Sequence, residues 1–370
     1  MPLPQGLIYI QPDFCSFHEA QHMSANDPTP EAATTETAPN INPDTGSDAV
    51  QETAQDTAQG EVADAVRGNW VDRYAPAWTR PYLRLSRADR PIGTWLLLLP
   101  CWWSLLLAML SDGRASLSDL WIAVGCGAGA WLMRGAGCTW NDITDRDFDG
   151  AVARTRSRPI PSGQVSAKQA AVWMALQALI AFGILLTFPP AAIALGVLSL
   201  LPVAIYPFAK RFTWWPQIFL GLAFNWGALL AWAAHTGSLS WPPFVLYIAG
   251  IAWTLFYDTI YAHQDKEDDA LIGVKSTARL FADQTPRWLR RFLVASVTLM
   301  ALTVLGAMLP GANPLALVLA LAGPWAFGWH MVWQLRRLDI DDNDRCLMLF
   351  RANRDAGLLP LPFFAAALLV

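Results

Sequence analysis

The chain has 370 residues, of which 54% are hydrophobic and 15% are charged. Ordinary soluble domains carry about 25% charged residues, and a single soluble domain of this length could not bury so much apolar surface. The composition therefore excludes a soluble globular enzyme, a disulfide scaffold and a nucleic-acid-binding protein, and it places most of the chain in a lipid bilayer.

The first 66 residues differ from the rest in charge. They hold 11 Asp and Glu and no Lys or Arg, whereas the remainder holds 26 basic against 19 acidic side chains. Residues 1–66 are also too poor in apolar side chains to offset the entropy of ordering. We therefore expect a disordered acidic tail, without the pattern of a secretory signal or a transit peptide. We expect residues 75–370 to form one transmembrane domain.

The transmembrane domain is predicted to be all-α. A helix needs about 20 apolar residues to cross the hydrocarbon core, and nine stretches approach that length. Before the first stretch, Arg alternates with Leu, Tyr and Ile, which is typical of an interfacial amphipathic segment. The nine stretches are 92–111, 119–139, 167–187, 190–206, 216–234, 243–261, 289–310, 314–334 and 355–370.

Positive charge alternates between the connections. Those after the first, third, fifth and seventh stretches hold a single basic residue, Arg114, whereas the N-terminal approach and the other four hold 24 of the 26 Lys and Arg. The positive-inside rule places the basic side in the cytoplasm. We therefore expect a multi-pass protein of the cell inner membrane, with the N-terminus and the basic loops cytoplasmic.

Two dense groups of acids end the second and sixth stretches, both on the basic side. Stacked carboxylates repel each other unless a cation lies between them, and oxygen ligands suit Mg²⁺, which combines a few carboxylates with phosphates and water. Two such faces opposite each other would hold a diphosphate through Mg²⁺; the alternative is a set of solvated acids that only mark helix ends. If the helices continue, two rows each share one face: Asn141, Asp145 and Asp149 (i, i+4, i+8), and Asp258, Tyr261, Asp265 and Asp269 (i, i+3, i+7, i+11).

Basic residues flank both acidic groups. Arg binds phosphate oxygens as a fork and Lys as a point charge, although lipid headgroups and topology alone also select basic loops. We expect a substrate-binding role for Arg154, Arg158, Lys210 and Lys275.

Arg134 lies inside the second stretch, seven residues before Asn141 and about 10 Å deeper in the membrane. An intramembrane Arg is costly and normally has an anionic partner. That partner is either an Asp of the protein or the carboxylate of a substrate.

The sequences NDITDRDFD with RTRSRPIPSG, and YDTIYAHQDKEDDALIGVKSTA, closely resemble the two Asp-rich signatures of the UbiA superfamily of intramembrane aromatic prenyltransferases. DRPIGTWLLLLPCWWSL and LMRGAGCTWND are similar to the 4-hydroxybenzoate polyprenyltransferase branch. The resemblance covers roughly residues 75–370. It implies nine transmembrane helices around a central cavity, Mg²⁺ dependence, a polyprenyl diphosphate donor and an aromatic acceptor, with no nucleic acid and no obligate protein partner.

The resemblance also implies roles for individual residues. The implied reaction joins a polyprenyl group to the ring carbon ortho to the hydroxyl of 4-hydroxybenzoate, which gives a 3-polyprenyl-4-hydroxybenzoate, an early ubiquinone precursor. The implied metal ligands are Asn141, Asp145, Asp149, Asp265 and Asp269, the implied catalytic residues are Asp142, Asp145, Asp258 and Asp265, and Arg134, Asn141 and Tyr261 are expected to bind substrate.

Other functions fit the residues less well. A cation-coupled transporter would place its acids near the bilayer midplane at broken helices, whereas these acids lie at helix ends. A CDP-alcohol phosphotransferase would need three metal-binding acids that are absent here, since position 146 is Arg and positions 167 and 171 are Ala. An acceptor of the homogentisate or naphthoate type stays open, as does the length of the prenyl chain.

Overall fold

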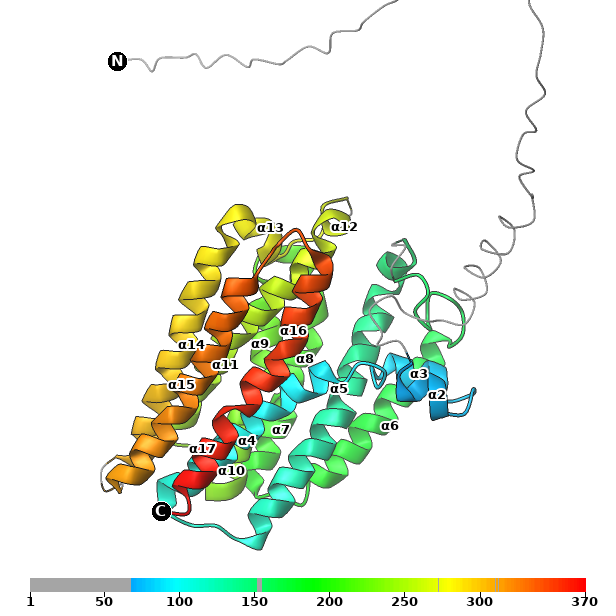
Figure 1. The fold of residues 1–370 in the computed structure, drawn as a ribbon. Coiled ribbons are helices and arrows are strands. Elements are labelled where there is room, and N and C mark those ends of the chain that lie inside the picture. Colours follow the sequence, from blue (N-terminus) through cyan, green and yellow to red (C-terminus); the bar gives the residue numbers. More distant parts are fainter. Residues whose placement is uncertain (1–67, 152–154, 272, 310, 312) are drawn as a thin grey trace, which may run out of the picture. The chain divides into compact units, whose positions relative to one another are not determined.

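All the secondary structure of the described residues is helical. The computed structural model describes residues 68–151, 155–271, 273–309, 311 and 313–370 (Figure 1), so the predicted tail and Arg154 lie outside the described residues. The helices are α2 (Trp70–Tyr74), α3 (Arg80–Leu85), α4 (Ile92–Asp112), α5 (Leu117–Ala151), α6 (Ala167–Leu185), α7 (Pro190–Leu198), α8 (Leu200–Phe212), α9 (Pro216–Phe224), α10 (Gly227–Thr236), α11 (Trp241–Ala262), η1 (His263–Asp265), α12 (Lys266–Leu271), α13 (Thr277–Phe281), η2 (Ala282–Gln284), α14 (Thr285–Met308), α15 (Pro314–Arg337), α16 (Asn343–Leu358) and α17 (Pro360–Ala367).

The prediction of an all-α multi-pass membrane protein is confirmed, and each of the nine apolar stretches is a helix or a pair of helices. Seven helical segments of the described chain are long and apolar enough to cross a membrane. The other two stretches correspond to α5 and to α16 with α17. The seven segments are Ile92–Asp112, Ala167–Leu185, Pro190–Phe212, Pro216–Thr236, Trp241–Asp265, Thr277–Met308 and Pro314–Arg337.

Two helix boundaries differ from the sequence prediction by twelve residues each. α5 runs to Ala151, twelve residues past the predicted end at 139, so it carries the first acidic group on a continuous helix. The last stretch begins at Asn343 rather than at 355, because Asp342 caps α16 by accepting a hydrogen bond from the backbone N–H of Arg345. Pro360 then starts α17 at its first turn.

The fifth apolar stretch is broken at Asn225 and Trp226, between α9 and α10. Backbone groups freed inside a membrane need internal partners, and side chains bind across the break. The amide of Asn225 donates to the carbonyl oxygen of Gly221 and to the hydroxyl of Thr254. The indole N–H of Trp226 donates to the carbonyl oxygen of Leu195, which joins the break to α7.

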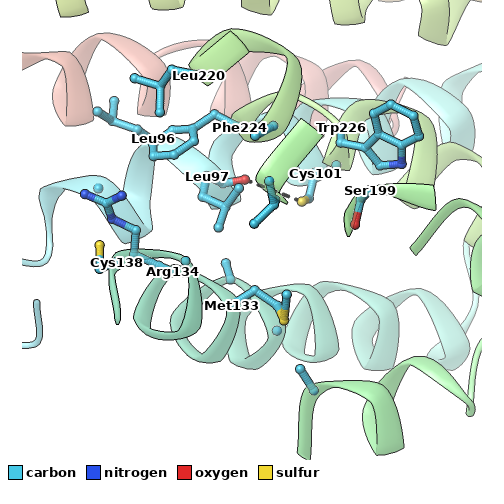
Figure 2. A pocket seen from close by; sticks show the side chains of 18 of the residues that line it. Leu96, Leu97, Cys101, Met133, Arg134, Cys138, Ser199, Leu220, Phe224 and Trp226 are labelled. Atoms are coloured by element: carbon cyan, nitrogen blue, oxygen red, sulfur yellow. Dashed lines mark hydrogen bonds between the residues drawn. The ribbon is translucent and has the colours of Figure 1, made fainter. Parts of the chain in front are cut away.

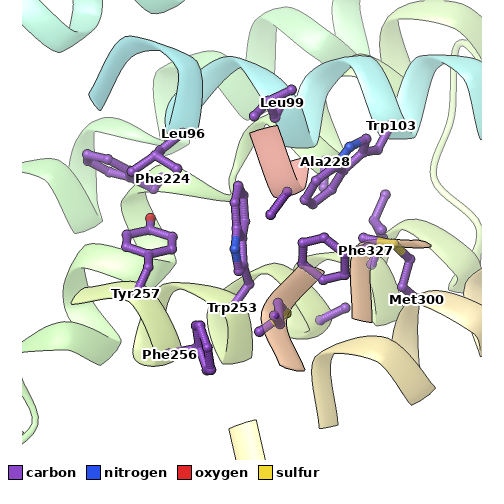
Figure 3. Packing of buried hydrophobic residues seen from close by; sticks show 14 of the residues in the cluster. Leu96, Leu99, Trp103, Phe224, Ala228, Trp253, Phe256, Tyr257, Met300 and Phe327 are labelled. Carbon is purple, nitrogen blue, oxygen red and sulfur yellow. The ribbon is translucent and has the colours of Figure 1, made fainter. Parts of the chain in front are cut away.

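An aromatic cluster joins α4 to α11 and α15 (Figure 3). The rings of Trp103, Trp253 and Phe327 lie 5.0–5.6 Å apart by centroid, at tilted or edge-to-face angles. Each indole N–H also has an acceptor on α16: Trp103 donates to the carbonyl oxygen of Gly357, and Trp253 donates to Oδ1 of Asn353. Lipid tails are as apolar as these side chains, so shape and polar contacts hold the helices together. α4 accordingly lies beside α16 and α17 (Figure 1).

Candidate active site

The two acidic groups meet at one polar pocket between the ends of α5, α8 and α11. The pocket has a volume of about 240 Å³. Its lining contains every predicted site residue except Arg134, Asp142 and the undescribed Arg154. The predicted residues that line it are Asn141, Asp145, Asp149, Arg158, Lys210, Asp258, Tyr261, Asp265, Asp269 and Lys275.

The extension of α5 presents its carboxylates to basic side chains. Asp145, whose side chain is almost fully buried, accepts from Nζ of Lys210 at 2.6 Å and lies 3.5 Å from Arg211. Asp149 accepts from Nη1 of Arg158 at 2.7 Å. Burial raises the pKa of Asp149, and the Arg158 guanidinium opposes that shift. The stacked carboxylates predicted from the i, i+4 spacing are therefore each neutralised by a residue from another element.

The second acidic group does not lie on one continuous helix. α11 ends at Ala262 and gives way to the short 3₁₀ helix η1, which carries Asp265, before α12 carries Asp269. The chain after α12 folds back onto α8, because the N–H of Lys275 donates to the carbonyl oxygen of Lys210. This return brings Asp269 and Lys275 to the same pocket as the end of α5.

A larger apolar cavity of about 700 Å³ continues from the polar pocket into the membrane-spanning part of the chain (Figure 2). Asn141, Arg158, Tyr206, Asp258 and Tyr261 line both spaces. The walls of the cavity come from α4 to α11 and from α16, and they are mostly aliphatic and aromatic. The site therefore has a charged compartment at the helix ends and an apolar compartment below it.

Arg134 projects into the apolar cavity toward Phe224 (Figure 2). Its guanidinium lies 5.2 Å from the centroid of the Phe224 ring, and its Nε is buried without a hydrogen bond. Among the described residues it makes no ion pair, although Asp258 lines the same cavity. Gly93 makes room for it, since a Cβ atom there would lie 2.4 Å from Nε.

Asp142 lies elsewhere than its predicted catalytic role requires. The sequence predicts a catalytic role for it, but this fully buried side chain lines neither compartment. It accepts from Arg87 at 2.6 Å and lies 3.4 Å from Arg158. The reason is the helical period, which turns the neighbour of Asn141 about 100° away from the pocket face. Asp142 instead holds two arginines in place.

Arg87 and Arg90 line the apolar cavity, although sequence reasoning assigned their segment to the membrane interface. The signal available in the sequence was three charges within four residues directly before an apolar helix, in RADRPIG. Arg87 adopts a left-handed backbone, with φ of 55°, which costs a non-glycine residue energy and is often found at functional sites. Its contact with Asp142 helps to fix that conformation.

Comparison with known proteins shows the family of the chain. Residues 97–354 match the model of the UbiA prenyltransferase family. The chain belongs to that family. It is 50% identical over 288 residues to the mitochondrial 4-hydroxybenzoate polyprenyltransferase of Bos taurus, covering 77% of this chain and 74% of the relative. It is 46% identical over 293 residues to the Arabidopsis thaliana protein of the same name, covering 79% and 69%.

Solved structures show the same fold. A UbiA homologue from Aeropyrum pernix K1 superposes with a TM-score of 0.58 at 23% identity, covering 74% of this chain and 96% of that one. A UbiA homologue from Archaeoglobus fulgidus, solved bound to GPP and Mg²⁺, superposes with a TM-score of 0.58 at 19% identity, covering 78% and 100%.

The polar pocket has donors that suit a divalent metal. Within the described ranges, no three His, Cys, Asp or Glu side chains stand close enough to enclose an ion by themselves. Mg²⁺ does not need such a cage, because it usually takes one or two carboxylates together with substrate phosphates and water. The oxygen donors round this pocket fit such shared binding: Asn141, Asp145, Asp149, Asp265 and Asp269.

Proposed function

We propose that this chain is a 4-hydroxybenzoate polyprenyltransferase, which makes 3-polyprenyl-4-hydroxybenzoate for ubiquinone biosynthesis. The observation that carries the proposal is the joining of a charged compartment to an apolar cavity whose wall contains Arg134. Relatives that are 44–50% identical carry this name. Each of the three parts of the reaction then has a place: the diphosphate, the prenyl chain and the benzoate.

The donor's diphosphate belongs in the polar pocket. Arg158, Lys210 and Lys275 supply positive charge there, and Lys210 can exchange its bond to Asp145 for a phosphate oxygen. Mg²⁺, when bound, neutralises the diphosphate and improves it as a leaving group. The residues proposed to hold this ion are Asn141, Asp145, Asp149, Asp265 and Asp269.

Breaking the bond between C1 and the diphosphate oxygen leaves an allylic cation and moves the electron pair to the leaving group. The basic side chains stabilise that charge, and the apolar cavity keeps water from the cation. The ring carbon ortho to the phenol hydroxyl attacks C1 and then loses its proton. Asp258 lines both compartments, so it is the carboxylate we assign to receive that proton.

The acceptor's carboxylate pairs with Arg134 in this scheme. Arg134 has a buried Nε without a hydrogen bond and lies in the cavity just below the polar pocket. A planar guanidinium can bind a carboxylate through two parallel hydrogen bonds. Binding there would orient the benzoate ring toward C1 of the donor.

The test is a membrane assay with radiolabelled 4-hydroxybenzoate and polyprenyl diphosphates, with and without Mg²⁺. We expect Mg²⁺-dependent prenylated product from wild type, and none from Asp145→Asn or Asp265→Asn. Asp147→Asn is the matched control, because Asp147 is on the same helix as Asp145 but its side chain is 89% exposed. If product formed only with homogentisate or a naphthoate, the proposed acceptor would be wrong. If the protein transported cations and formed no product, the proposed enzymatic function would be wrong.

For localisation we propose the cell inner membrane, with the basic loops in the cytoplasm. The support is the charge alternation of the sequence, while the relatives named above are mitochondrial. Labelling of single cysteines with a membrane-impermeant reagent at positions 114 and 146 would test it. The proposal requires position 146, and not position 114, to be reached from the cytoplasmic side.

A further inference from the structure

The connection between α12 and α13 carries two pocket residues, one on each side of a chain reversal. Asp269 lies in the last turn of α12, and Lys275 lies just before α13, and both line the polar pocket. Gly273, between them, has a left-handed backbone with φ of 74°, which glycine adopts without steric cost. The positions of Asp269 and Lys275 therefore depend on the contacts that hold the two sides of this connection together.

The α13 side of the connection is fixed by buried polar contacts. The N–H of Thr277 donates to Oε1 of Gln217 on α9 at 3.3 Å, and its hydroxyl lies 2.7 Å from the hydroxyl of Thr259 on α11. Ser276 caps α13, because its hydroxyl accepts from the N–H of Arg279. α13 is therefore tied to two membrane helices and provides a firm base for the side chain of Arg279.

Arg279 joins the two sides of the reversal. Its Nη1 carries two hydrogens and donates to the carbonyl oxygen of Asp269 at 3.1 Å and to that of Val274. The carbonyl of Asp269 is one of the last four of α12, which have no partner within the helix. Its second lone pair accepts from the N–H of Val274 at 2.9 Å. One cation thus binds the backbone on both sides, through hydrogen bonds that its charge strengthens.

The guanidinium of Arg279 is held from a third direction and stays outside the site. It lies 5.5 Å from the centroid of the Trp214 ring, in the connection between α8 and α9, at a distance where a cation is attracted to an aromatic face. The side chain lines neither the polar pocket nor the apolar cavity. Arg279 therefore acts on the pocket through the backbone of the connection.

We propose that Arg279 is a positioning residue that sets Asp269 and Lys275 for the donor's diphosphate and its Mg²⁺, an inference that rests on the prenyl-transfer function above. Without this guanidinium, two backbone bonds tie the connection: Val274 to Asp269, and Lys275 to the carbonyl of Lys210. Both pocket residues belong to the diphosphate end of the site. Loss of Arg279 should therefore weaken the binding of donor and metal and leave the acceptor's binding largely unchanged.

Kinetics of matched variants provide the first test. Arg279→Met removes the donors, so it should raise the donor KM and the Mg²⁺ concentration for half-maximal rate about tenfold, the loss expected for one hydrogen bond to a charged group. Arg279→Lys keeps the charge without the planar fork, so both constants should lie between those of wild type and Arg279→Met. The KM for 4-hydroxybenzoate should stay close to that of wild type, because Arg134 does not line the polar pocket.

The matched control is Arg291→Met. Arg291 is an exposed residue of α14 whose guanidinium lies 4.6 Å from the centroid of the Trp288 ring. It also lines neither compartment. This variant loses a charge and an aromatic contact, as Arg279→Met does, and its donor KM and Mg²⁺ requirement should equal those of wild type.

Amide hydrogen exchange gives a readout independent of turnover, in protein without metal or substrate. The N–H groups of Val274 and Lys275 donate to the carbonyls of Asp269 and Lys210, so their exchange reports the opening of the connection. Both should exchange about tenfold faster in Arg279→Met and at the wild-type rate in Arg291→Met. The N–H of Thr277, bound to Gln217, is the internal reference and should exchange at the wild-type rate in both variants.

Three results would overturn the proposal. A raised donor KM with unchanged exchange at Val274 and Lys275 would make Arg279 a direct ligand of the diphosphate. Faster exchange with an unchanged donor KM and Mg²⁺ requirement would show that the site does not depend on this connection. Equally faster exchange at Thr277 would show that α13 itself unfolds. Failure of wild type to make product from any donor would instead reject the proposed function, whereas the exchange comparison does not depend on turnover.

Discussion

Replacing Arg134 by Ala should weaken the acceptor's binding far more than the donor's. The guanidinium lies in the apolar cavity over the ring of Phe224, and among the described residues it makes no ion pair. A charge-assisted hydrogen bond to a buried anion contributes about 1.5–3 kcal/mol. Each 1.4 kcal/mol is tenfold, so we expect the KM for 4-hydroxybenzoate to rise about tenfold to a hundredfold.

Three further variants separate the possible roles of the arginine. Arg134→Lys keeps the charge without the planar fork, so its acceptor KM should lie between those of wild type and Arg134→Ala. Gly93→Ala places a methyl group 2.4 Å from Nε, which must displace the guanidinium and should also raise the acceptor KM. Phe224→Leu removes the cation–π contact and keeps the charge, so it shows how much of the effect comes from packing.

Steady-state kinetics with one substrate varied at a saturating concentration of the other provides the measurement. The reasoning requires the acceptor KM to rise at least several times more than the donor KM. A rise in the donor KM alone would place Arg134 in the diphosphate site. A loss of folded protein with unchanged constants would make it part of the scaffold.

Asp142→Asn should lower the melting temperature and raise the donor KM, because breaking a buried ion pair costs about 3–5 kcal/mol and frees Arg87 and Arg158; an unchanged melting temperature would contradict this. Deleting residues 2–64 should leave prenyl transfer largely intact, because that segment has no basic residue and no apolar periodicity; a deletion that inserts normally yet loses most activity would refute it. Burial raises the pKa of Asp89 to about 6 from 3.8. The folded state therefore binds this proton more tightly than the unfolded chain does. As the pH rises from about 4 to about 6, ionisation of Asp89 lowers the free energy of unfolding. The melting temperature of Asp89→Asn relative to that of wild type should therefore increase from pH 4 to pH 7. A difference in melting temperature that stays constant over this range would show that Asp89 does not cause the pH dependence.

The sequence predicts the acidic pocket well because spacing alone determines which side chains share a helix face. Asn141, Asp145 and Asp149 share the pocket because α5 continues through all three, and Lys210 reaches it because it ends a neighbouring helix on the same side. The alternation of basic and uncharged loops supports the same prediction, because it assigns these helix ends to one side of the membrane.

Features that depend on a distant partner could not be predicted in this way. Asp142 carries the same charge as its neighbours, and only its contact with Arg87, 55 residues earlier, shows that it positions arginines. The break at Trp226 likewise depends on the carbonyl of Leu195. The periodicity of the sequence shows which residues share a face of one helix. It does not show which residues of other segments contact that face, and the roles of Asp142 and Trp226 depend on those contacts.

The adjacency of α4 to α16 and α17 has a consequence for how the protein is made. α4 is the first membrane helix to leave the ribosome, and the indole of Trp103 finds its acceptor, the carbonyl of Gly357, only when nearly all of the chain has been synthesised. Until then this face of α4 lacks its partner within the bilayer. The cavity wall between the first and last helices is therefore completed at the end of translation, and loss of even the last two helices should give a chain that inserts but cannot assemble its site.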